Sequence, residues 1–432
     1  MLSWPYTFCS CYYMQPVIHK TVDHLFRHES GKLVAVLSKL LGLENLETAH
    51  DIVQDTLLQA LSTWAYNGLP DKPSAWLTTV AKNKAIDYLR REKKFRVNIS
   101  PQYSYLLRSE YVLSPTINQL FEEGEIQDSQ LRMIFACCHP SIPAESQIAL
   151  ALKTLCGLSS SEIAKAFLTN EETISKRIYR AKEKIRTERI ELELPPADAL
   201  PARLDAALKS LYLLFNEGYN SSSPDQLIRE DLCEEAMRLT YLLTLHQITN
   251  TSKVKAVLAL FCFQASRLQA RLDDGGNIIV LKYQDRSKWY QPLIQKGFYY
   301  MDAALTAPFE TSVYHLEAAI ASLHASAKTF EQTSWKGIYF LYKQLYNIQP
   351  TAIIAMNKAI ASGYAHDKKS ALEQLMQIKG LENYYLYYTS IGEMYFEINN
   401  KTEAKKFYEK ALQLTSSKQE KQLILDKMRN CL

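Results

Sequence analysis

The sequence predicts an all-α protein built from more than one domain. Its 432 residues exceed what one ordinary core holds, which indicates two to four domains. Only 13 Gly and 15 Pro supply the turns that many strands would need, whereas Ala, Leu, Lys, Glu and Gln recur in long stretches that favour helices. Hydrophobic residues at 47% and charged residues at 22% are typical of a globular chain. We therefore expect two small helical domains followed by a long helical region.

Breaks in the helical pattern divide the chain into five segments. We expect a tail at 1–16, a first helical domain at 17–96, a linker rich in Ser, Pro, Tyr and Glu at 97–127, a second helical domain at 128–193, and a helical remainder at 194–432. Pro195, Pro196 and Pro201 mark the last boundary, because proline interrupts the hydrogen bonds of a helix.

Charge and cysteine content exclude several classes of protein. A net charge of +4 is too small to identify a nucleic-acid binder by itself, so local clustering of basic residues must decide. The eight cysteines show no closely spaced framework, which favours reduced thiols. Neither Cys9 with Cys11 nor the run from Cys137 to His139 is followed by a second pair at zinc-site spacing. We expect no metal, no cofactor and, without an apolar run of ~18 residues, a cytoplasmic protein that does not enter the membrane.

An acidic helix is predicted over 46–64, before the break at 67–70. Its inward positions are Ala49, Ile52, Val53, Thr56, Leu57 and Ala60. This leaves Asp51, Gln54 and Asp55 outside as a cluster of carboxylates and an amide, which suits a basic protein partner. An ordinary solvated surface is the alternative, and no pocket supports acid-base catalysis by these groups.

A basic helix follows over 74–94. Its apolar stripe consists of Leu77, Ala81, Ala85, Tyr88 and Leu89, and a second face carries Trp76, Asn83, Asp87, Arg90 and Lys94. An aromatic ring, an amide and basic heads on one face are the groups that stack on bases and contact phosphates. The alternative interpretation is a solvated charged face, the commonest kind of helix surface.

The second domain has helix-turn-helix spacing. Ser159 and Glu162 have the spacing of a capping box, which predicts a helix start there, and a second helix is expected to begin at Glu171 after a short turn. In that second helix the apolar positions are Ile174, Ile178, Ala181 and Ile185, and the exposed side carries Thr173, Lys176, Arg177, Arg180 and Lys184. This is a basic recognition helix for the major groove, although such helix pairs also occur in proteins that never bind DNA.

These segments resemble the extracytoplasmic-function sigma factors. Ala49-His-Asp-Ile-Val-Gln-Asp-Thr-Leu57 is similar to the family's polymerase-binding helix, and the stretch from Ala75-Trp-Leu to Asp87-Tyr-Leu-Arg-Arg91 to its -10 element helix. Leu158-Ser-Ser-Ser-Glu-Ile-Ala164 followed by Thr173-Ile-Ser-Lys-Arg-Ile-Tyr-Arg-Ala-Lys182 resembles its -35 helix-turn-helix. The likeness covers Val17 to about Arg189, except the linker. Leu168 stands where the family usually has Gly, so the angle of the recognition helix is less tightly fixed.

The resemblance implies three sets of functional residues. Contact with core RNA polymerase is expected at Asp51, Gln54 and Asp55. Strand opening and contact with the -10 element are expected at Trp76, Asn83, Asp87, Arg90 and Arg91. Contact with the -35 element is expected at Thr173, Lys176, Arg177 and Arg180. The implied partners are core polymerase and promoter DNA, and no covalent chemistry is expected.

The last helices match the tetratricopeptide repeat pattern. Large, small, aromatic and glycine positions of that repeat coincide with Tyr388, Ile391, Gly392, Tyr395, Ala404, Tyr408 and Ala411. Earlier stretches at 314–321 and 350–359 look like degenerate repeats, and the alternative is a plain helical bundle. We expect a repeat-like domain that binds a protein partner or the chain's own DNA-binding domains.

Three further segments, at 213–219, 271–276 and 283–289, resemble the extension of the sigma-factor group that carries C-terminal repeats. Asp273 and Asp274 could begin a calcium loop, but the sequence after them lacks the later ligands of that pattern. Asn216 and Glu217 could form a catalytic pair, but no Ser, Cys or His with a placed partner supports one. A turn and a buried polar network are expected instead. The sequence gives no physical reason why Asp285 accompanies Arg286 and Trp289.

Two other functions remain open. The first is a DNA-binding repressor that uses the helix-turn-helix and never joins polymerase. The second is a hydrolase or transferase in the C-terminal half, against which stands the absence of P-loop, Gly-x-Ser-x-Gly and metal-ligand spacing.

Overall fold

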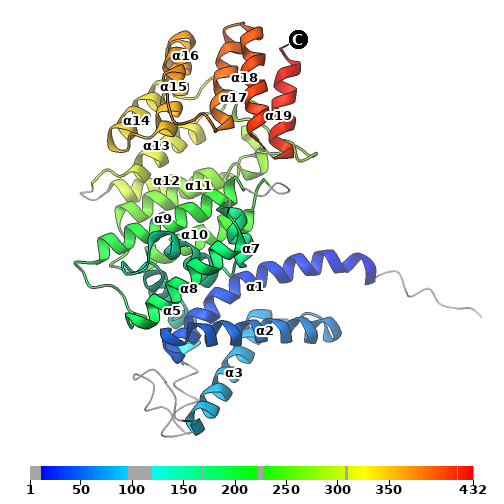
Figure 1. Cartoon of the computed structure of the whole chain (residues 1–432), viewed down its shortest axis with the longest axis vertical. Coiled ribbons are helices and arrows are strands. Elements are labelled where there is room, and N and C mark those ends of the chain that lie inside the picture. Colours follow the sequence, from blue (N-terminus) through cyan, green and yellow to red (C-terminus); the bar gives the residue numbers. More distant parts are fainter. Residues whose placement is uncertain are drawn as a thin grey trace, which may run out of the picture. The chain divides into compact units, whose positions relative to one another are not determined.

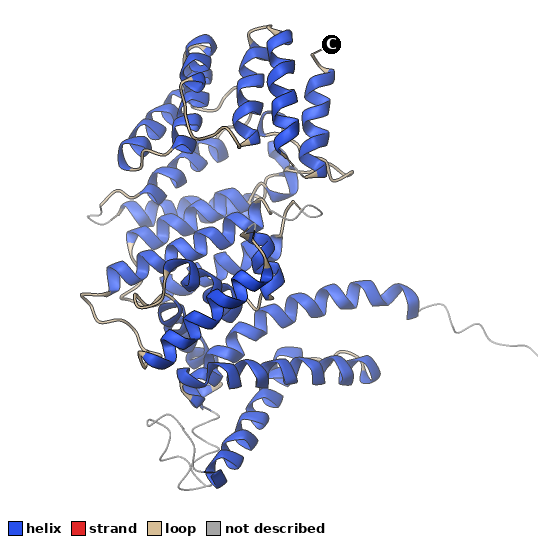
Figure 2. Cartoon of the chain, viewed as in Figure 1, coloured by secondary structure: helices blue, strands red, loops and turns tan. Residues whose placement is uncertain are grey.

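The computed structural model describes residues 11–95, 119–167, 169–221, 227–306, 310–415 and 417–431. Residues 1–10 of the expected tail, residues 97–118 of the expected linker, and Leu168 lie outside these ranges. The described residues form helices and no strand, with one isolated bridge between Leu272 and Ile278 (Figures 1 and 2). The prediction of an all-α fold is therefore confirmed. The chain divides into two compact units, Met1–Leu211 and Tyr212–Leu432.

The first unit contains the helices of both predicted small domains. These are α1 (Cys11–Leu41), the 3-10 turn η1 (Leu43–Asn45), α2 (Leu46–Asn67), α3 (Pro73–Phe95), α5 (Glu123–Cys137), α6 (Ala144–Leu155), α7 (Ser160–Ala166), α8 (Glu171–Thr187) and the start of α9 (Leu200–Tyr219). Helix α1 begins inside the expected tail, and α5 begins inside the expected linker. The division between the units falls within α9, C-terminal to the boundary expected at residue 194.

The apolar stripes predicted for α2, α3 and α8 belong to the core of this unit. Ile52 and Val53 of α2, Leu77 and Leu89 of α3, and Ile174 of α8 are all buried. Their spacing at i, i+3, i+4 and i+7 places them on one side of each helix, which burial of that side stabilises. The opposite sides of these helices are consequently exposed.

Capping fixes the helix-turn-helix. The Ser159 Oγ accepts a hydrogen bond from the Glu162 backbone N–H at 3.1 Å, and the Glu162 carboxylate accepts one from the Ser159 N–H at 2.8 Å. This is the predicted capping box. Helix α8 begins at Glu171, as predicted, and the Asn170 side chain accepts a hydrogen bond from the Thr173 N–H at 2.8 Å. Both helices therefore have defined starting points on either side of the turn.

The second unit continues from α9 as a series of helices. They are α10 (Glu230–Leu245), α11 (Ser252–Ala265), α12 (Gln291–Leu305), α13 (Val313–Ser326), α14 (Trp335–Ile348), α15 (Ala352–Ala365), α16 (Lys368–Met376), α17 (Tyr385–Glu397), α18 (Lys401–Leu414) and α19 (Lys418–Arg429), with the 3-10 turns η3 (Leu268–Ala270), η4 (Leu281–Tyr283) and η5 (Arg286–Lys288) before α12. Consecutive helices from α11 to α19 pack against one another. None of the described helices combines the length and hydropathy needed to cross a bilayer.

Helices α17 and α18 form a closely packed pair. Ala404, Tyr408 and Ala411 are buried, and a Cβ atom on Gly392 would lie 2.6 Å from a ring carbon of Tyr408. Glycine is therefore required for this close approach of helix and ring. These contacts agree with the helix pair expected at this position, while its assignment to the tetratricopeptide class stays a prediction.

The segment before α12 is fixed by a tryptophan between two arginines. Trp289 is 2% exposed, and the guanidinium groups of Arg267 and Arg286 lie 5.1 and 5.0 Å from its ring. Arg286 also donates to the carbonyl oxygens of His324 and Ala327 at 2.6 and 2.9 Å. These contacts explain the occurrence of Arg286 with Trp289: together they fasten the segment to α13.

Asp285 and Asp273 both organise local turns. The Asp285 carboxylate accepts a hydrogen bond from the Ser287 N–H at 2.9 Å and so caps η5. The Asp273 carboxylate accepts hydrogen bonds from the N–H groups of Gly275 and Asn277 at 2.9 and 2.8 Å. This is the turn that was expected in place of a calcium loop.

Candidate nucleic-acid interface

The outer side of α2 carries an acidic face next to exposed leucines. Asp51, Gln54 and Asp55 are all exposed, as their positions opposite the buried stripe require. Leu58 and Leu61 continue this face by one and two turns and are 62% and 43% exposed. Exposed leucines beside carboxylates are typical of a surface that a protein partner covers. Sequence reasoning missed both leucines, although Leu58 follows Asp55 and Gln54 by three and four residues and Leu61 follows Leu58 by three, a spacing that would have indicated them.

The outer side of α3 carries polar and basic groups that solvent reaches. Asn83, Asp87, Arg90 and Arg91 are exposed. Arg90 lies 3.8 Å from the Asp87 carboxylate, and the Arg91 Nε donates to the Asp87 carbonyl oxygen at 3.3 Å. Asp87 therefore contacts both arginines, one through its carboxylate and one through its backbone. The side chain of Lys94 lies outside the described residues.

Trp76 differs from the rest of this face because it is only half-exposed. Its ring meets Trp64 of α2 edge-on, with 5.4 Å between the ring centroids, and Trp64 in turn lies 5.7 Å from Phe26 of α1. Aromatic pairs in this geometry stabilise each other beyond the area they bury. Trp76 is thus both part of the exposed face and a contact that orients α3 on α2.

The recognition helix α8 presents its basic side to solvent. Lys176 and Arg180 are exposed, and Thr173 and Arg177 are half-buried. The Lys176 Nζ lies 2.7 Å from a carboxylate oxygen of Glu172, one turn earlier. A carboxylate at this spacing positions the lysine without removing it from solvent.

Two features of α8 were not expected from its sequence. Arg177 forms an ion pair of 2.5 Å with Glu145 at the start of α6, so one predicted DNA-contacting group is engaged within the protein. Tyr179 is 64% exposed beside Arg180, which adds an aromatic ring to the basic side. Tyr179 has no apolar neighbour four residues before or after it on the same side of α8. This pattern in the sequence could have indicated that the ring is exposed.

Charges from α6 and α8 act on a half-buried histidine of α2. Burial, followed by the positive charges of Lys182 and Lys153, lowers the pKa of His50 to about 3. The His50 Nε2 is buried and has no hydrogen-bond partner among the described residues. His50 is therefore neutral, with its Nε2 turned away from solvent, and it directly precedes the exposed Asp51.

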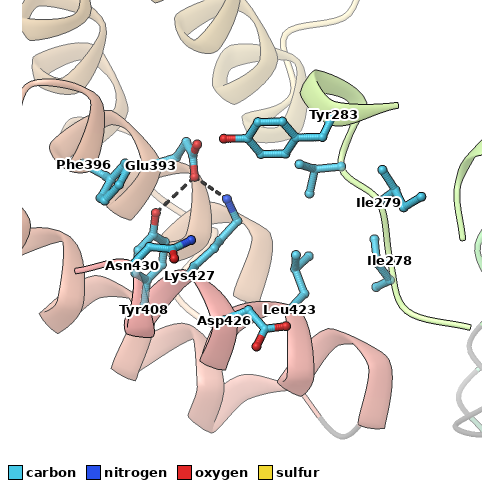
Figure 3. Close-up of a pocket in the computed structure, with 11 residues that line it drawn as sticks. Ile278, Ile279, Tyr283, Glu393, Phe396, Tyr408, Leu423, Asp426, Lys427 and Asn430 are labelled. Carbon is cyan, nitrogen blue, oxygen red and sulfur yellow. Dashed lines mark hydrogen bonds and ion pairs between the residues drawn. The ribbon is translucent and has the colours of Figure 1, made fainter. Parts of the chain in front are cut away.

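A separate cavity of about 250 Å³ occurs in the second unit. Figure 3 shows Ile278, Ile279 and Tyr283 on one side of it and residues of α17 and α18–α19 on the other. The Glu393 carboxylate accepts a hydrogen bond from the Tyr408 hydroxyl at 3.1 Å and pairs with Lys427. The segment before α12 thus forms one wall of a hollow whose opposite wall is the last helices.

A second glutamate of α17 joins the same segment to the repeat-like helices. The Glu397 carboxylate accepts from the Lys282 ammonium at 2.7 Å and from the Tyr364 hydroxyl at 3.2 Å, and it also pairs with Lys368. Burial opposes the charge of Glu397, but the bonds from Lys282 and Lys368 lower its pKa. Within the parts of the chain that the structure covers, no group of three His, Cys, Asp or Glu residues is arranged to hold a metal ion.

Three family models match the chain. One is described as Sigma-70 region 2 and covers residues 25–95, and another is described as Sigma-70, region 4 and covers residues 132–185. The third, a family of unknown function (DUF6596), covers residues 203–305. The first two contain the predicted contact residues on α2, α3 and α8, and the third contains the segment fastened by Trp289.

Similar proteins fall into two sets. A protein of Rhizobium meliloti (strain 1021), described as uncharacterized, is 34% identical over 392 residues, which are 90% of this chain and 92% of the relative. The ECF RNA polymerase sigma factor SigE of Mycolicibacterium smegmatis is 25% identical over 164 residues, 38% of this chain and 60% of the relative. The RNA polymerase sigma factor SigV of Bacillus subtilis is 26% identical over 139 residues, 32% of this chain and 74% of the relative.

Proposed function

The chain contains a Sigma-70 region 2 and a Sigma-70 region 4 domain, and from this premise we propose that it is an RNA polymerase sigma factor of the extracytoplasmic-function type. We propose three separate contacts for its first unit. Helix α2 binds core polymerase, α3 captures the opened strand at the -10 element, and α8 reads the duplex at the -35 element. The observation that carries this proposal is the exposure of the three outer helix sides opposite their buried stripes.

The contact with polymerase is proposed for Asp51, Gln54 and Asp55, extended by Leu58. Carboxylates steer a basic partner surface and fix its orientation, whereas an exposed leucine contributes burial when that surface closes over it. The combination of the two on one helix side supports a protein partner rather than a solvated face.

The -10 contact is proposed for the α3 face. Trp76 has the half-exposed ring that a base separated from its duplex stacks on, and Asn83 supplies amide hydrogen bonds to a base edge. Arg90 and Arg91, which both contact Asp87, neutralise phosphates of the captured strand.

The -35 contact is proposed for the α8 face. Thr173 and Lys176 lie in the first turns of α8, where a helix in the major groove meets base edges, and Arg177 and Arg180 follow toward the phosphates. For Arg177 this requires an exchange of the Glu145 carboxylate for a DNA group, since the two form an ion pair without DNA. None of these steps makes or breaks a covalent bond, so the proposed function is not an enzymatic one.

The second unit is proposed to bind a protein partner or the chain's own first unit and thereby control initiation. The cavity between Ile279 and α19, with a paired Glu393 and Lys427 inside it, is the feature that supports a binding role (Figure 3). Affinity purification of the full chain from its native cell, with and without Leu423→Lys in this cavity, tests whether a protein partner depends on it.

Run-off transcription with purified core polymerase tests the main proposal. The full chain and core are incubated with a promoter library, and transcripts are sequenced from their 5′ ends. A sigma factor yields starts at a defined distance from common -35 and -10 sequences. If the chain binds the same DNA without core and yields no specific start, it is the helix-turn-helix repressor and the sigma proposal is wrong.

A further inference from the structure

A second cavity of the second unit lies among α14, α15 and the end of α16. Its volume is about 510 Å³, larger than that of the cavity in Figure 3 and within the range of about 300–1,000 Å³ that is usual for small-molecule sites. The remaining described residues of its lining are apolar, and none is Asp or Glu. The polar side chains on its walls are Tyr346, Thr351, Lys358, Gln374, Gln377 and Lys379. We call this cavity the lysine cavity.

Lys358 has no counter-ion within the protein as described. The Lys358 Nζ lies 4.2 Å from the centre of the Tyr346 ring, and no carboxylate of the described residues forms an ion pair with it. The half-buried Lys427, in the cavity of Figure 3, is by contrast paired with Glu393. Lys358 is half-buried as well, so its charge is neither neutralised by the protein nor fully hydrated.

The positions of Lys358 and Tyr346 are fixed by the helices that carry them. The Thr351 Oγ accepts a hydrogen bond from the Ile354 N–H at 3.2 Å and so caps α15 about two turns before Lys358. Tyr346 of α14 packs against the apolar core to which Ile354 also belongs. A ligand that contacts these side chains therefore has little of the chain to order on binding.

Lys379 brings a second ammonium group to the lysine cavity, from the chain after α16. Lys379 is exposed, and hydrogen bonds from the backbone N–H groups of Gly380 and Glu382, followed by the charge of Lys379, lower the pKa of the Glu382 carboxyl. Residues 335–380 contain six lysines and two carboxylates, a net charge of +4 that equals that of the whole chain. The helices that build the cavity thus carry an excess of positive charge that the rest of the chain lacks.

The polar groups of the lysine cavity match a ligand with negative oxygens. Two ammonium groups donate hydrogen bonds, and the amides of Gln374 and Gln377 and the Thr351 hydroxyl donate further ones. Phosphate and carboxylate oxygens only accept hydrogen bonds, and their bonds to a charged donor are about twice as strong as neutral ones. A cationic or neutral ligand would leave the charge of Lys358 without a counter-ion.

We propose that the lysine cavity binds a small polyanionic metabolite, whose phosphate or carboxylate oxygens contact Lys358 and Lys379 together. This site goes beyond the proposed promoter contacts and is separate from the cavity of Figure 3. The two lysines come from different elements, so the ligand joins α15 to the chain after α16. It stabilises their packing by the free energy with which it binds the folded chain.

Calorimetric titration of the full chain with pyrophosphate and with citrate tests the site, and glucose is the neutral control compound. We expect an anion to bind and glucose not to bind, and the preferred anion shows whether the ligand carries phosphate or carboxylate groups. Lys358→Gln with Lys379→Gln should weaken this binding at least about tenfold, because two charge-assisted hydrogen bonds are lost. Lys336→Gln with Lys343→Gln is the matched control. It removes the same charge from exposed positions of α14 outside the cavity lining and should bind normally.

Acylation of lysines by an N-hydroxysuccinimide ester, read by mass spectrometry, locates the site in the unaltered chain. The bound anion should slow acylation of Lys358 and Lys379 and leave that of Lys343 unchanged. Absence of binding by both anions, an equal loss of affinity in the control variant, or equal protection of Lys343 would overturn the site. Both measurements report ligand binding alone, so their outcome is distinguishable from a failure of the sigma function.

Discussion

The indole ring of Trp76 stands edge-on to that of Trp64, with ring planes at 62° and centroids 5.4 Å apart. Trp64 is 8% exposed, whereas Trp76 keeps part of its ring in solvent. One tryptophan thus fixes the orientation of the other at the proposed point of strand capture. Replacing Trp76 by leucine separates its packing on Trp64 from its proposed stacking on a base.

Trp76→Leu should retain the fold and weaken capture of the -10 strand. Leucine still packs on Trp64, but it offers no aromatic face, and stacking of one base contributes about 1–3 kcal/mol. We expect the affinity of the core-bound chain for a single-stranded -10 oligonucleotide to fall about tenfold, measured by fluorescence anisotropy. Trp335→Leu, a half-buried tryptophan of the second unit, is the control and should bind normally. Normal binding by Trp76→Leu would remove Trp76 from the interface.

Arg177→Ala with Arg180→Ala should flatten the salt dependence of -35 binding. Each phosphate contact contributes a slope of about 0.9 in log affinity against log salt, so two lost contacts reduce the slope by nearly two. Electrophoretic mobility shift assays at roughly 50–200 mM salt measure this slope. Arg238→Ala, whose guanidinium pairs with Glu235, is the control. A slope that does not change would show that the two arginines face elsewhere.

The sequence predicted those features that depend on neighbours within one helix. The buried stripe of α8, the start at Glu171 and the capping box of Ser159 with Glu162 all arise from contacts three or four residues apart. Such local contacts are encoded by spacing alone, which is why the exposed sides of α2, α3 and α8 were also predictable.

Features that join distant parts of the chain were not predictable. The pairing of Glu47 with Lys182 spans 135 residues, and nothing near either residue specifies the other. The same holds for Arg286, whose carbonyl partners follow 38 and 41 residues later. The half-burial of Trp76 likewise depends on Trp64 of another helix, so periodicity placed it on a fully exposed face.

Asp51→Lys with Asp55→Lys should abolish association with core polymerase. Both side chains are exposed, so the substitutions reverse the charge of the face without disturbing the buried stripe. Pull-down of core by the immobilised full chain should fall below a tenth of the wild-type amount at unchanged helicity. Glu373→Lys with Glu409→Lys changes the net charge equally on exposed positions of the second unit and serves as the control. Wild-type recovery of core by the first variant would refute the contact.

Leu58→Ser tests the apolar part of the same face. Leu58 is 62% exposed, so the change should have little effect on the free energy of unfolding. Loss of one apolar contact at a partner surface costs about 1–2 kcal/mol, which predicts a tenfold weaker affinity for core. Leu425→Ser, an exposed leucine of α19, should leave that affinity unchanged. If both variants bind core polymerase with equal affinity, only the carboxylates of this face contact the polymerase.

His50 should make the first unit sensitive to acid. Burial and then the charges of Lys182 and Lys153 lower its pKa to about 3, whereas an unfolded histidine titrates near 6.5. Between these values the unfolded state binds more protons, so stability is complete above about pH 6.5 and is lost as the pH falls toward 3. At about pH 5 the loss is roughly 2 kcal/mol. Glu47, one turn earlier on α2, forms an ion pair of 3.1 Å with Lys182.

His50→Phe should remove this sensitivity. Phenylalanine fills a similar volume without a buried nitrogen that lacks a partner, so stability at pH 7.5 should stay equal or rise. Hydrogen exchange of α2 peptides at pH 7.5 and 5.0 measures the effect within the first unit. His324 of the second unit also has a pKa lowered to about 3, so a global melting curve would mix both residues. A pH response of α2 that persists in His50→Phe would refute the assignment.

Glu47→Lys should weaken the contact between α2 and α8, because it replaces the 3.1 Å ion pair with Lys182 by repulsion between two ammonium groups. The pair is largely exposed at Glu47, so we expect the free energy of unfolding of the first unit to fall by about 1 kcal/mol or less. Hydrogen exchange of α8 peptides in the free chain should become a fewfold faster. Adding Lys182→Glu restores opposite charges and should restore the exchange rate, since a purely structural defect would not be repaired by a second substitution. Exchange that stays fast in the double variant would mean that the pair does not hold α8 against α2.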